Sequence, residues 1–244
     1  MTKMITTSML APKSRPGQWK KGAWQRLSVA LLFMVLTAST AWAQGYDYIA
    51  ADGTVHNTAD EGITPEILNG STGACNLGVE DQTTWYVVSH SIGYEDVINC
   101  QGTVNIILVD GMTMSVTKNG RFYGMSSTLN IYGQAKGTGK LSINTADGHD
   151  GILCDHVVIN GGTVECTAES DGQSSISGKS SLTINGGTVT ATASDTPDGM
   201  GLSSLGNVTI NGGKVTATGG VGIYSSLGTI TLGSSHADDF IYAS

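Results

Sequence analysis

The most regular feature of the chain is an alternation of apolar and polar residues that recurs about every 25 positions. In the stretch 182–193, "LTINGGTVTATA", the residues Leu182, Ile184, Val189 and Ala191 share one side of the chain, and threonines occupy the other. Alternation with a period of two is typical of a β-strand that buries one face. The unit is therefore predicted to be two short strands joined at Asn-Gly-Gly.

The Asn-Gly-Gly corners stand at residues 160–162, 185–187 and 211–213. Glycine and asparagine tolerate the positive φ that a tight corner needs. An antiparallel hairpin could also use such a turn. That alternative leaves unexplained why the whole unit repeats in the same order.

The repeat extends over five units, in which the strand before the corner occupies 129–131, 157–159, 182–184, 208–210 and 230–232. A third apolar point is predicted in each unit, at Met125, Ile152, Ile176, Leu202 and Ile223. A unit this small cannot bury its own apolar face and must stack on its neighbours. Three strands per coil and stacked coils predict an all-β fold, a right-handed parallel β-helix.

The two ends of the chain differ from this pattern. Residues 44–80 lack the period and are predicted to form an irregular N-terminal cap, since terminal units of solenoids are atypical. The β-helix is predicted to span 81–244. Beyond residue 244 it either continues in a longer protein or leaves its last coil uncapped, which would expose strand edges.

The first 43 residues have the composition of a secretory signal peptide. Six of the twelve Lys and Arg residues precede an apolar run at 27–40, and Ala41-Trp42-Ala43 follows it as a small-x-small cleavage signature. Cleavage is expected after Ala43, and the alternative is a retained membrane anchor. The predicted location is therefore secreted or at the cell surface, with no membrane span after cleavage.

Charge and cysteine content narrow the choice of partners. The chain that follows the predicted cleavage site keeps six basic and 20 acidic residues, a formal charge of −14. Such an acidic surface repels nucleic acid.

The exported chain would carry its four cysteines into an oxidising compartment, where disulfides persist. They are Cys75, Cys100, Cys154 and Cys166, and their pairing cannot be derived from the sequence.

A resemblance to a known group of proteins rests on the order of several motifs. "ADGTVHNT", "WYVVSHSI", "VNIILVDGMTMSV" and "TLNIYGQAKGTGKLSI" are followed by successive "INGGTVTATA" coils and "DDFIYAS". This order resembles the secreted, carbohydrate-binding-type β-helix modules of bacterial cell-surface proteins, with pectate-lyase-like architecture, over residues 47–244. The resemblance implies a right-handed β-helix, a surface location and a polysaccharide or surface glycan as partner.

The favoured function is a non-catalytic module that binds polysaccharide or mediates adhesion. Ladders of hydroxyl groups, among them Thr188 and Thr190, would face a repeating polymer, and Tyr132 and Tyr224 could offer aromatic platforms. The structural alternatives are that threonine favours solvent-facing strands and that each tyrosine packs at a coil edge. A purely structural surface stalk would need no ligand.

An enzyme on the same fold is the main alternative. A polysaccharide hydrolase needs paired carboxylates, and a lyase needs calcium with a basic proton acceptor. Beyond residue 43 the chain has a single arginine, Arg121, and most of its acidic residues fall in predicted loops. No catalytic residue is therefore predicted.

The loop acids suggest one cofactor, calcium. They follow the second strand of their coils, so stacking would align them along one edge: Asp147, Asp150, Glu169, Asp171, Asp195 and Asp198. Carboxylate oxygens with glycine nearby can bind calcium, although no EF-hand spacing is present. The alternative is ordinary solvated loop charge.

Overall fold

The computed structural model describes residues 45–145 and 148–244. The predicted signal peptide and Asp147 lie outside these residues. Within the described part the regular elements are β-strands, and no helix there is long and apolar enough to cross a membrane.

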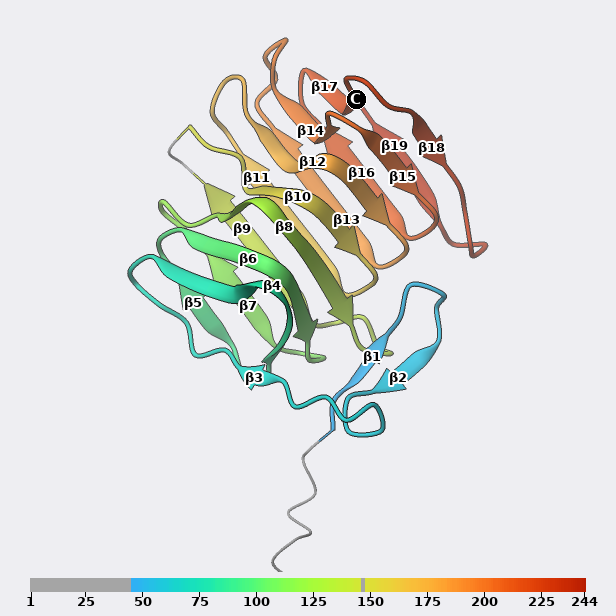
Figure 1. The fold of residues 1–244 in the computed structure, drawn as a ribbon. Coiled ribbons are helices and arrows are strands. Elements are labelled where there is room, and N and C mark those ends of the chain that lie inside the picture. Colours follow the sequence, from blue (N-terminus) through green and yellow to red (C-terminus); the bar gives the residue numbers. More distant parts are fainter. Residues whose placement is uncertain (1–44, 146–147) are drawn as a thin grey trace, which may run out of the picture. The chain divides into compact units, whose positions relative to one another are not determined.

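The strands follow one another along the chain at short intervals (Figure 1). They are β1 (Asp47–Ile49), β2 (Val55–Asn57), β3 (Glu66–Ile67), β4 (Cys75–Val88), β5 (Ile92–Tyr94), β6 (Ile98–Leu108), β7 (Thr113–Val116), β8 (Phe122–Gly133), β9 (Lys140–Thr145), β10 (Ile152–Ile159), β11 (Thr163–Ala168), β12 (Ser174–Ile184), β13 (Thr188–Ala193), β14 (Met200–Ser204), β15 (Asn207–Ile210), β16 (Lys214–Thr218), β17 (Val221–Ser225), β18 (Ile230–Leu232) and β19 (Phe240–Ala243).

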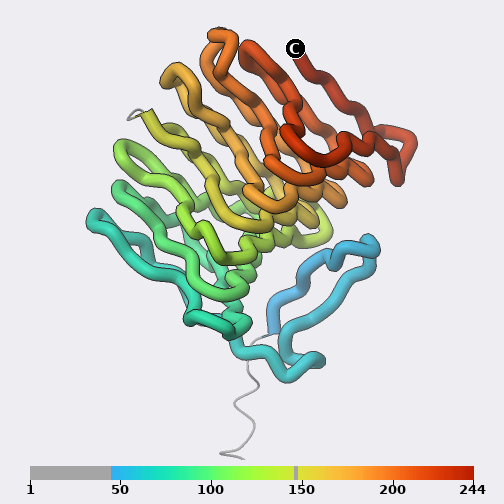
Figure 2. The backbone as a smooth tube through the Cα atoms, turned by 45° about the horizontal axis from the view of Figure 1, so that its top comes forward, coloured from blue at the N-terminus to red at the C-terminus, as the bar shows by residue number. Residues whose placement is uncertain are grey.

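Most of these strands pair in parallel with the equivalent strand one coil away. Over residues 45–145 and 148–244, one sheet runs from β3 through β4, β6, β8, β10 and β12 to β14, β15, β17 and β18, and a second runs from β5 to β19. The chain thus winds into a parallel β-solenoid of about seven turns, which the tube in Figure 2 follows coil by coil. The predicted parallel β-helix is confirmed.

Each coil has three sides because the long strands of the first sheet turn a corner. In β12, Ile176 pairs with Ile152 on one side of the bend, and Ile184 pairs with Ile159 on the other. The register shifts at the bend, between Cys154 and His156. The shorter strands of the second sheet form the third side.

The core consists of columns of inward residues in register. Ile131, Ile159, Ile184 and Ile210 stack on one side and are fully buried. On the third side the equivalent column is Leu141, Val164, Val189 and Val215, and Cys166 lies in line with Ala191 and Ala217 as predicted. Stacked apolar columns of this kind supply most of the hydrophobic stabilisation of a solenoid.

One predicted core position is wrong, and another is only partly covered. Met125 is exposed, and Phe122 takes its place as the fully buried partner of Ile152. The cause is the corner of β8, where the four residues 124–127 lie opposite the three residues 100–102 of β6 and shift the spacing. Leu232 faces inward in register with Ile210, yet 55% of its surface is exposed because it lies in the last rung.

The Asn-Gly-Gly corners have the predicted conformation at their second glycine. The φ angles of Gly162, Gly187 and Gly213 are 78°, 88° and 95°, values that favour glycine. Asn185 donates a hydrogen bond from Nδ2 to Oδ1 of Asn160 (2.7 Å), and Asn211 does the same to Asn185 (2.8 Å). The corner is thus stabilised by an asparagine ladder that runs along the solenoid.

The N-terminal strands β1 and β2 form an antiparallel hairpin rather than a coil. The hairpin packs against the outer surface of the first coils, beside β8 (Figures 1 and 2). After it, the chain reaches the first rung, where β3 pairs in parallel with β4 and Leu68 is buried in the core. The hairpin therefore covers the side of the solenoid, and the segment with Leu68 contributes to the end of its core.

Candidate functional site

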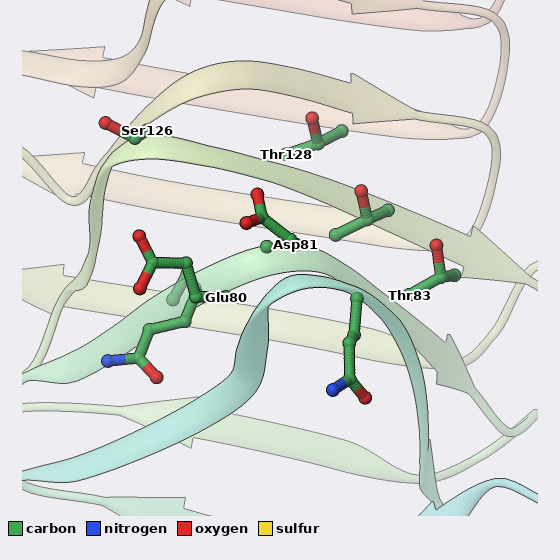
Figure 3. Close-up of a pocket in the computed structure, with 10 residues that line it drawn as sticks. Glu80, Asp81, Thr83, Ser126 and Thr128 are labelled. Carbon is green, nitrogen blue, oxygen red and sulfur yellow. The ribbon is translucent and has the colours of Figure 1, made fainter.

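A groove of about 490 Å³ lies at the corner where β4, β6 and β8 bend from one side of the solenoid to the next. We call it the corner groove. It is lined by Glu80, Asp81, Gln82, Thr83, Cys100, Gln101, Gly102, Thr103, Ser126 and Thr128 (Figure 3). Three successive coils therefore contribute polar side chains to one concave surface.

The corner groove exists because the corner of β4 is longer than that of its neighbour. Residues 79–82 of β4 lie opposite the single residue Gly102 of β6. Asp81 adopts a left-handed φ of 57°, which lets the longer corner turn back. A Cβ atom at Gly102 would lie 2.2 Å from the carbonyl oxygen of Val79, so only glycine fits beneath this corner.

Hydroxyl groups form one side of the corner groove. Thr83 pairs with Thr103, and Thr103 pairs with Thr128, so three threonines stand in register on the outer face. In Figure 3, Asp81 lies between Thr83 and the end of the groove where Glu80 and Ser126 are found. The carboxylates and hydroxyls together offer hydrogen-bond acceptors and donors over the width of three strands.

The charge of the corner groove is negative. Glu80 and Asp81 contribute carboxylates, and none of the ten lining residues is basic. Cys100 lies at the buried side with 6% of its surface exposed, and a hydrogen bond with Cys154 and burial raise its pKa well above the usual value. The thiol is therefore protonated at neutral pH and is a poor nucleophile.

An aromatic cluster adjoins the corner groove. Trp85 follows Thr83 by two residues on β4, on the same outer face, so the two side chains are about 7 Å apart along the strand. The ring of Trp85 stacks on that of Tyr132, with centroids 5.2 Å apart and an interplanar angle of 25°. Tyr48 of the hairpin contacts both rings, at 5.0 Å and 5.1 Å.

Polar contacts within the N-terminal segment fix Tyr48. Its hydroxyl donates a hydrogen bond to Oε2 of Glu61 (2.5 Å), and Nδ1 of His56 contacts the other carboxylate oxygen. Burial and the Glu61 carboxylate raise the pKa of Tyr48. The hydrogen bonds from Tyr48 and His56 lower the pKa of Glu61. These contacts with Glu61 hold the ring of Tyr48 in the orientation in which it contacts Trp85.

A second, smaller groove follows the Asn-Gly-Gly corners and has a volume of about 350 Å³. We call it the glycine groove. It is lined by glycines of three corners, by Ile49–Ala51 of the hairpin and by Ser235–His236. Lys136, Lys214 and Asp239 are its charged residues. It offers mainly backbone groups to a ligand.

The sequence-predicted ligand residues are not brought together. Tyr132 packs against both Trp85 and Tyr48. Tyr224 is 39% exposed on β17, near the C-terminal end of the solenoid. Thr188 and Thr190 face outward on β13, and Thr188 also lines the glycine groove.

The predicted calcium ligands lie in loops that stack only in part. Asp150 is half-buried and accepts a hydrogen bond from the amide of Ser174 (2.6 Å), and desolvation raises its pKa. The remaining described members are exposed: Glu169, Asp171, Asp195 and Asp198. Among the described residues, no group of three or more His, Cys, Asp or Glu side chains is arranged to bind a metal ion. Calcium binding stays a prediction.

Sequence reasoning missed the corner groove altogether. The available signal was the break in alternation at "GVEDQT" (78–83), where two acids interrupt an otherwise strand-like pattern. The sequence pattern does not single out Trp85 as part of a site. Its pairing with Tyr132 depends on two coils that lie 47 residues apart in sequence and could not be derived from the spacing.

Comparison with known proteins identifies one family. Residues 77–233 match the family described as carbohydrate-binding domain-containing protein. The matched segment includes the corner groove, Trp85 and most of the coils. None of the curated proteins and none of the solved structures matches the chain.

Proposed function

Because the chain belongs to the carbohydrate-binding domain-containing protein family, we propose that it is a non-catalytic module that binds a polysaccharide in the corner groove. The observation that supports this proposal is the gathering of two carboxylates, two amides and four hydroxyls on three successive coils. Sugar hydroxyls bind through such groups, and ionised carboxylates accept the stronger hydrogen bonds.

The charge of the corner groove suggests which glycans it accepts. Glu80 and Asp81 repel an anionic polymer and accept hydrogen bonds from a neutral one. An acidic polysaccharide would need a bridging cation, and we propose that calcium would bridge it at the exposed loop carboxylates of Asp195 and Asp198, which lie outside the corner groove. A chelator should therefore abolish binding of an acidic polymer and leave binding of a neutral one unchanged.

A location outside the cell is part of the same proposal. The predicted signal peptide at 1–43 would export the protein, and a surface-bound or secreted solenoid would meet glycans there. The described part contains free thiols at Cys75, Cys100, Cys154 and Cys166, so the location is proposed from the leader sequence and not from disulfides.

The decisive experiment compares two double variants of equal charge change. Glu80→Gln with Asp81→Asn keeps the size of the groove residues and removes both charges. Asp60→Asn with Glu66→Gln does the same at exposed positions outside the groove. Binding is measured on a glycan array and by affinity electrophoresis in neutral polysaccharides, with calcium and with chelator.

We expect the groove variant to lose about tenfold or more in affinity, because hydrogen bonds to charged groups are worth about 1.5–3 kcal/mol, and the control variant to bind like the wild type. Equal binding by both variants would contradict the assignment of the groove. Release of reducing ends or unsaturated products from any polymer would contradict the non-catalytic function and favour a hydrolase or lyase.

A further inference from the structure

The outer face of the first coils is continuous from the corner groove to the hairpin. Thr83, Thr103 and Thr128 form the first row across β4, β6 and β8. Trp85, Asn105 and Asn130 form the next row, and Val87, Ile107 and Tyr132 form the third. We call the first row the polar half of this surface and the second and third rows its aromatic half. The hairpin covers the aromatic half and leaves the polar half open.

The aromatic half is specific to these coils. The row of Trp85 continues on later coils as Val158, Thr183 and Thr209, which are short side chains. Beneath the rings, Asn105 is 2% exposed and accepts hydrogen bonds from Nδ2 of Asn130 (2.8 Å) and from the hydroxyl of Tyr132 (3.4 Å). Stacked rings above hydrogen-bonded amides form a rigid platform of the kind that the apolar face of a sugar ring can contact.

The hairpin covers this platform through few contacts. Tyr48, Val87 and Ile107 form a small buried cluster that is separate from the main core, because the wall of the solenoid lies between them. One side-chain hydrogen bond joins Nε2 of Gln134 to the carbonyl oxygen of Asp47 (2.9 Å). Removing the hairpin from the platform would therefore leave the stacked columns of the solenoid intact.

We propose that Trp85 and Tyr132 are the second half of the carbohydrate site, an aromatic platform for a neutral pyranose ring, and that the hairpin closes it by placing Tyr48 where that ring would stack. This inference rests on the proposed function. A neutral glycan chain long enough to reach from Thr83 past Trp85 would displace the hairpin and occupy both halves.

The physical basis is the exchange of one ring contact for another, at the cost of exposing Val87 and Ile107, which pack with Tyr48. A two-stranded hairpin is marginally stable alone and keeps its position through what it packs against. The sugar would replace the Tyr48 ring on Trp85, so the cost of opening lowers the apparent affinity of the closed protein. The two rows of the aromatic half carry no charged side chain, which favours an uncharged sugar.

Two variants separate this proposal from a purely structural contact. Tyr48→Ala and Trp85→Ala remove the same ring contact from opposite sides, so both loosen the hairpin, but only Tyr48→Ala keeps the platform. Val55→Ala, at an exposed position of the hairpin, is the control. Affinities for cellohexaose, mannohexaose and xylohexaose are measured by titration calorimetry on the full chain.

For the hexasaccharide that binds, we expect Tyr48→Ala to raise the affinity about tenfold. The variant loses one aromatic contact that stabilises the closed position of the hairpin, so less free energy is needed to open the platform. Trp85→Ala should lower the affinity, and the double variant should match Trp85→Ala. Val55→Ala should bind like the wild type. A decrease or no change with Tyr48→Ala, or equal effects of the two single variants, would overturn the proposal.

Hydrogen exchange of the wild type gives a second readout that needs no variant. Saturation with the bound hexasaccharide should speed exchange of the amides in 47–57 and slow exchange in 83–87. Unchanged exchange at 47–57 would mean that the sugar stays in the polar half, which would overturn the covered platform while the corner groove stands. Loss of binding in the Glu80→Gln, Asp81→Asn variant would in turn test the groove alone.

Discussion

Replacing Ile184 by alanine tests the stacked core most directly. Ile184 is fully buried on β12, with Ile159 on the coil before it and Ile210 on the coil after it, both in register and both fully buried. The ladders of backbone hydrogen bonds keep these coils at a spacing of about 4.8 Å. The neighbours therefore cannot collapse fully into the space that the missing side chain leaves.

The magnitude follows from the removed groups and the remaining cavity. Three carbon groups at about 0.8 kcal/mol each give about 2.4 kcal/mol of lost transfer free energy. A residual cavity of roughly 60 Å³ adds about 1.4 kcal/mol at 24 cal/mol per Å³. We expect a loss of about 2.5–4 kcal/mol in the free energy of unfolding, which corresponds to roughly 5–15 °C in Tm for a domain of this size.

The matched control is Thr183→Ala, one residue earlier on the same strand, where the side chain faces outward and is half-buried. Thermal and urea unfolding of both variants are followed by circular dichroism. Thr183→Ala should change the free energy of unfolding by less than about 1 kcal/mol. Equal midpoints for the two variants would refute the assignment of inward and outward residues.

The remaining predictions concern a corner, a carboxyl group and the thiols. Gly187→Ala should destabilise the protein by about 1 kcal/mol or more, because the φ of Gly187 is 88° and the new Cβ would lie 2.6 Å from the carbonyl oxygen of Gly162. Gly186→Ala should lower the melting temperature less, and the reverse order would contradict the corner geometry. Burial raises the pKa of Asp150, so its negative charge destabilises the folded state at pH values above the pKa of an unfolded aspartate. Asp150→Asn should therefore raise Tm at pH 7, and this gain should disappear as the pH falls below the usual aspartate pKa. A gain in Tm that does not depend on pH would be evidence against this cause. Burial also raises the pKa of Cys166 to about 12, and Cys100 and Cys154 are buried too. A thiol reagent should therefore label Cys75 first in the native protein. Rapid labelling of all four cysteines would contradict the burial of the other three.

The strand pattern and the corners could be predicted because both are local properties. Alternation in "LTINGGTVTATA" places Ile184 and Val189 inward whatever coil lies next to them. The second glycine of each Asn-Gly-Gly must adopt positive φ because of the tight turn itself. Repetition then makes stacking the only way to bury the apolar face, so the parallel solenoid follows from the sequence alone.

The candidate site could not be predicted because it arises from differences between coils. The corner groove depends on four residues of β4 lying opposite Gly102, and Met125 was misplaced because the corner of β8 also bulges. Trp85 meets Tyr132 only because β4 and β8 are two coils apart in space. The number of residues in each corner can be read from the sequence. Which corners lie next to one another depends on how the coils stack in the folded structure.

The hairpin shows the same division. The sequence by itself determined that residues 44–80 do not share the coil period. Only the tertiary structure placed Tyr48 on Trp85 and Tyr132 and buried Val87 and Ile107, which alternation alone would leave facing solvent. Period and turn chemistry act between residues close in sequence, whereas the cover over the aromatic platform is a contact between distant segments, decided by the free energy of burying apolar surface in the folded chain.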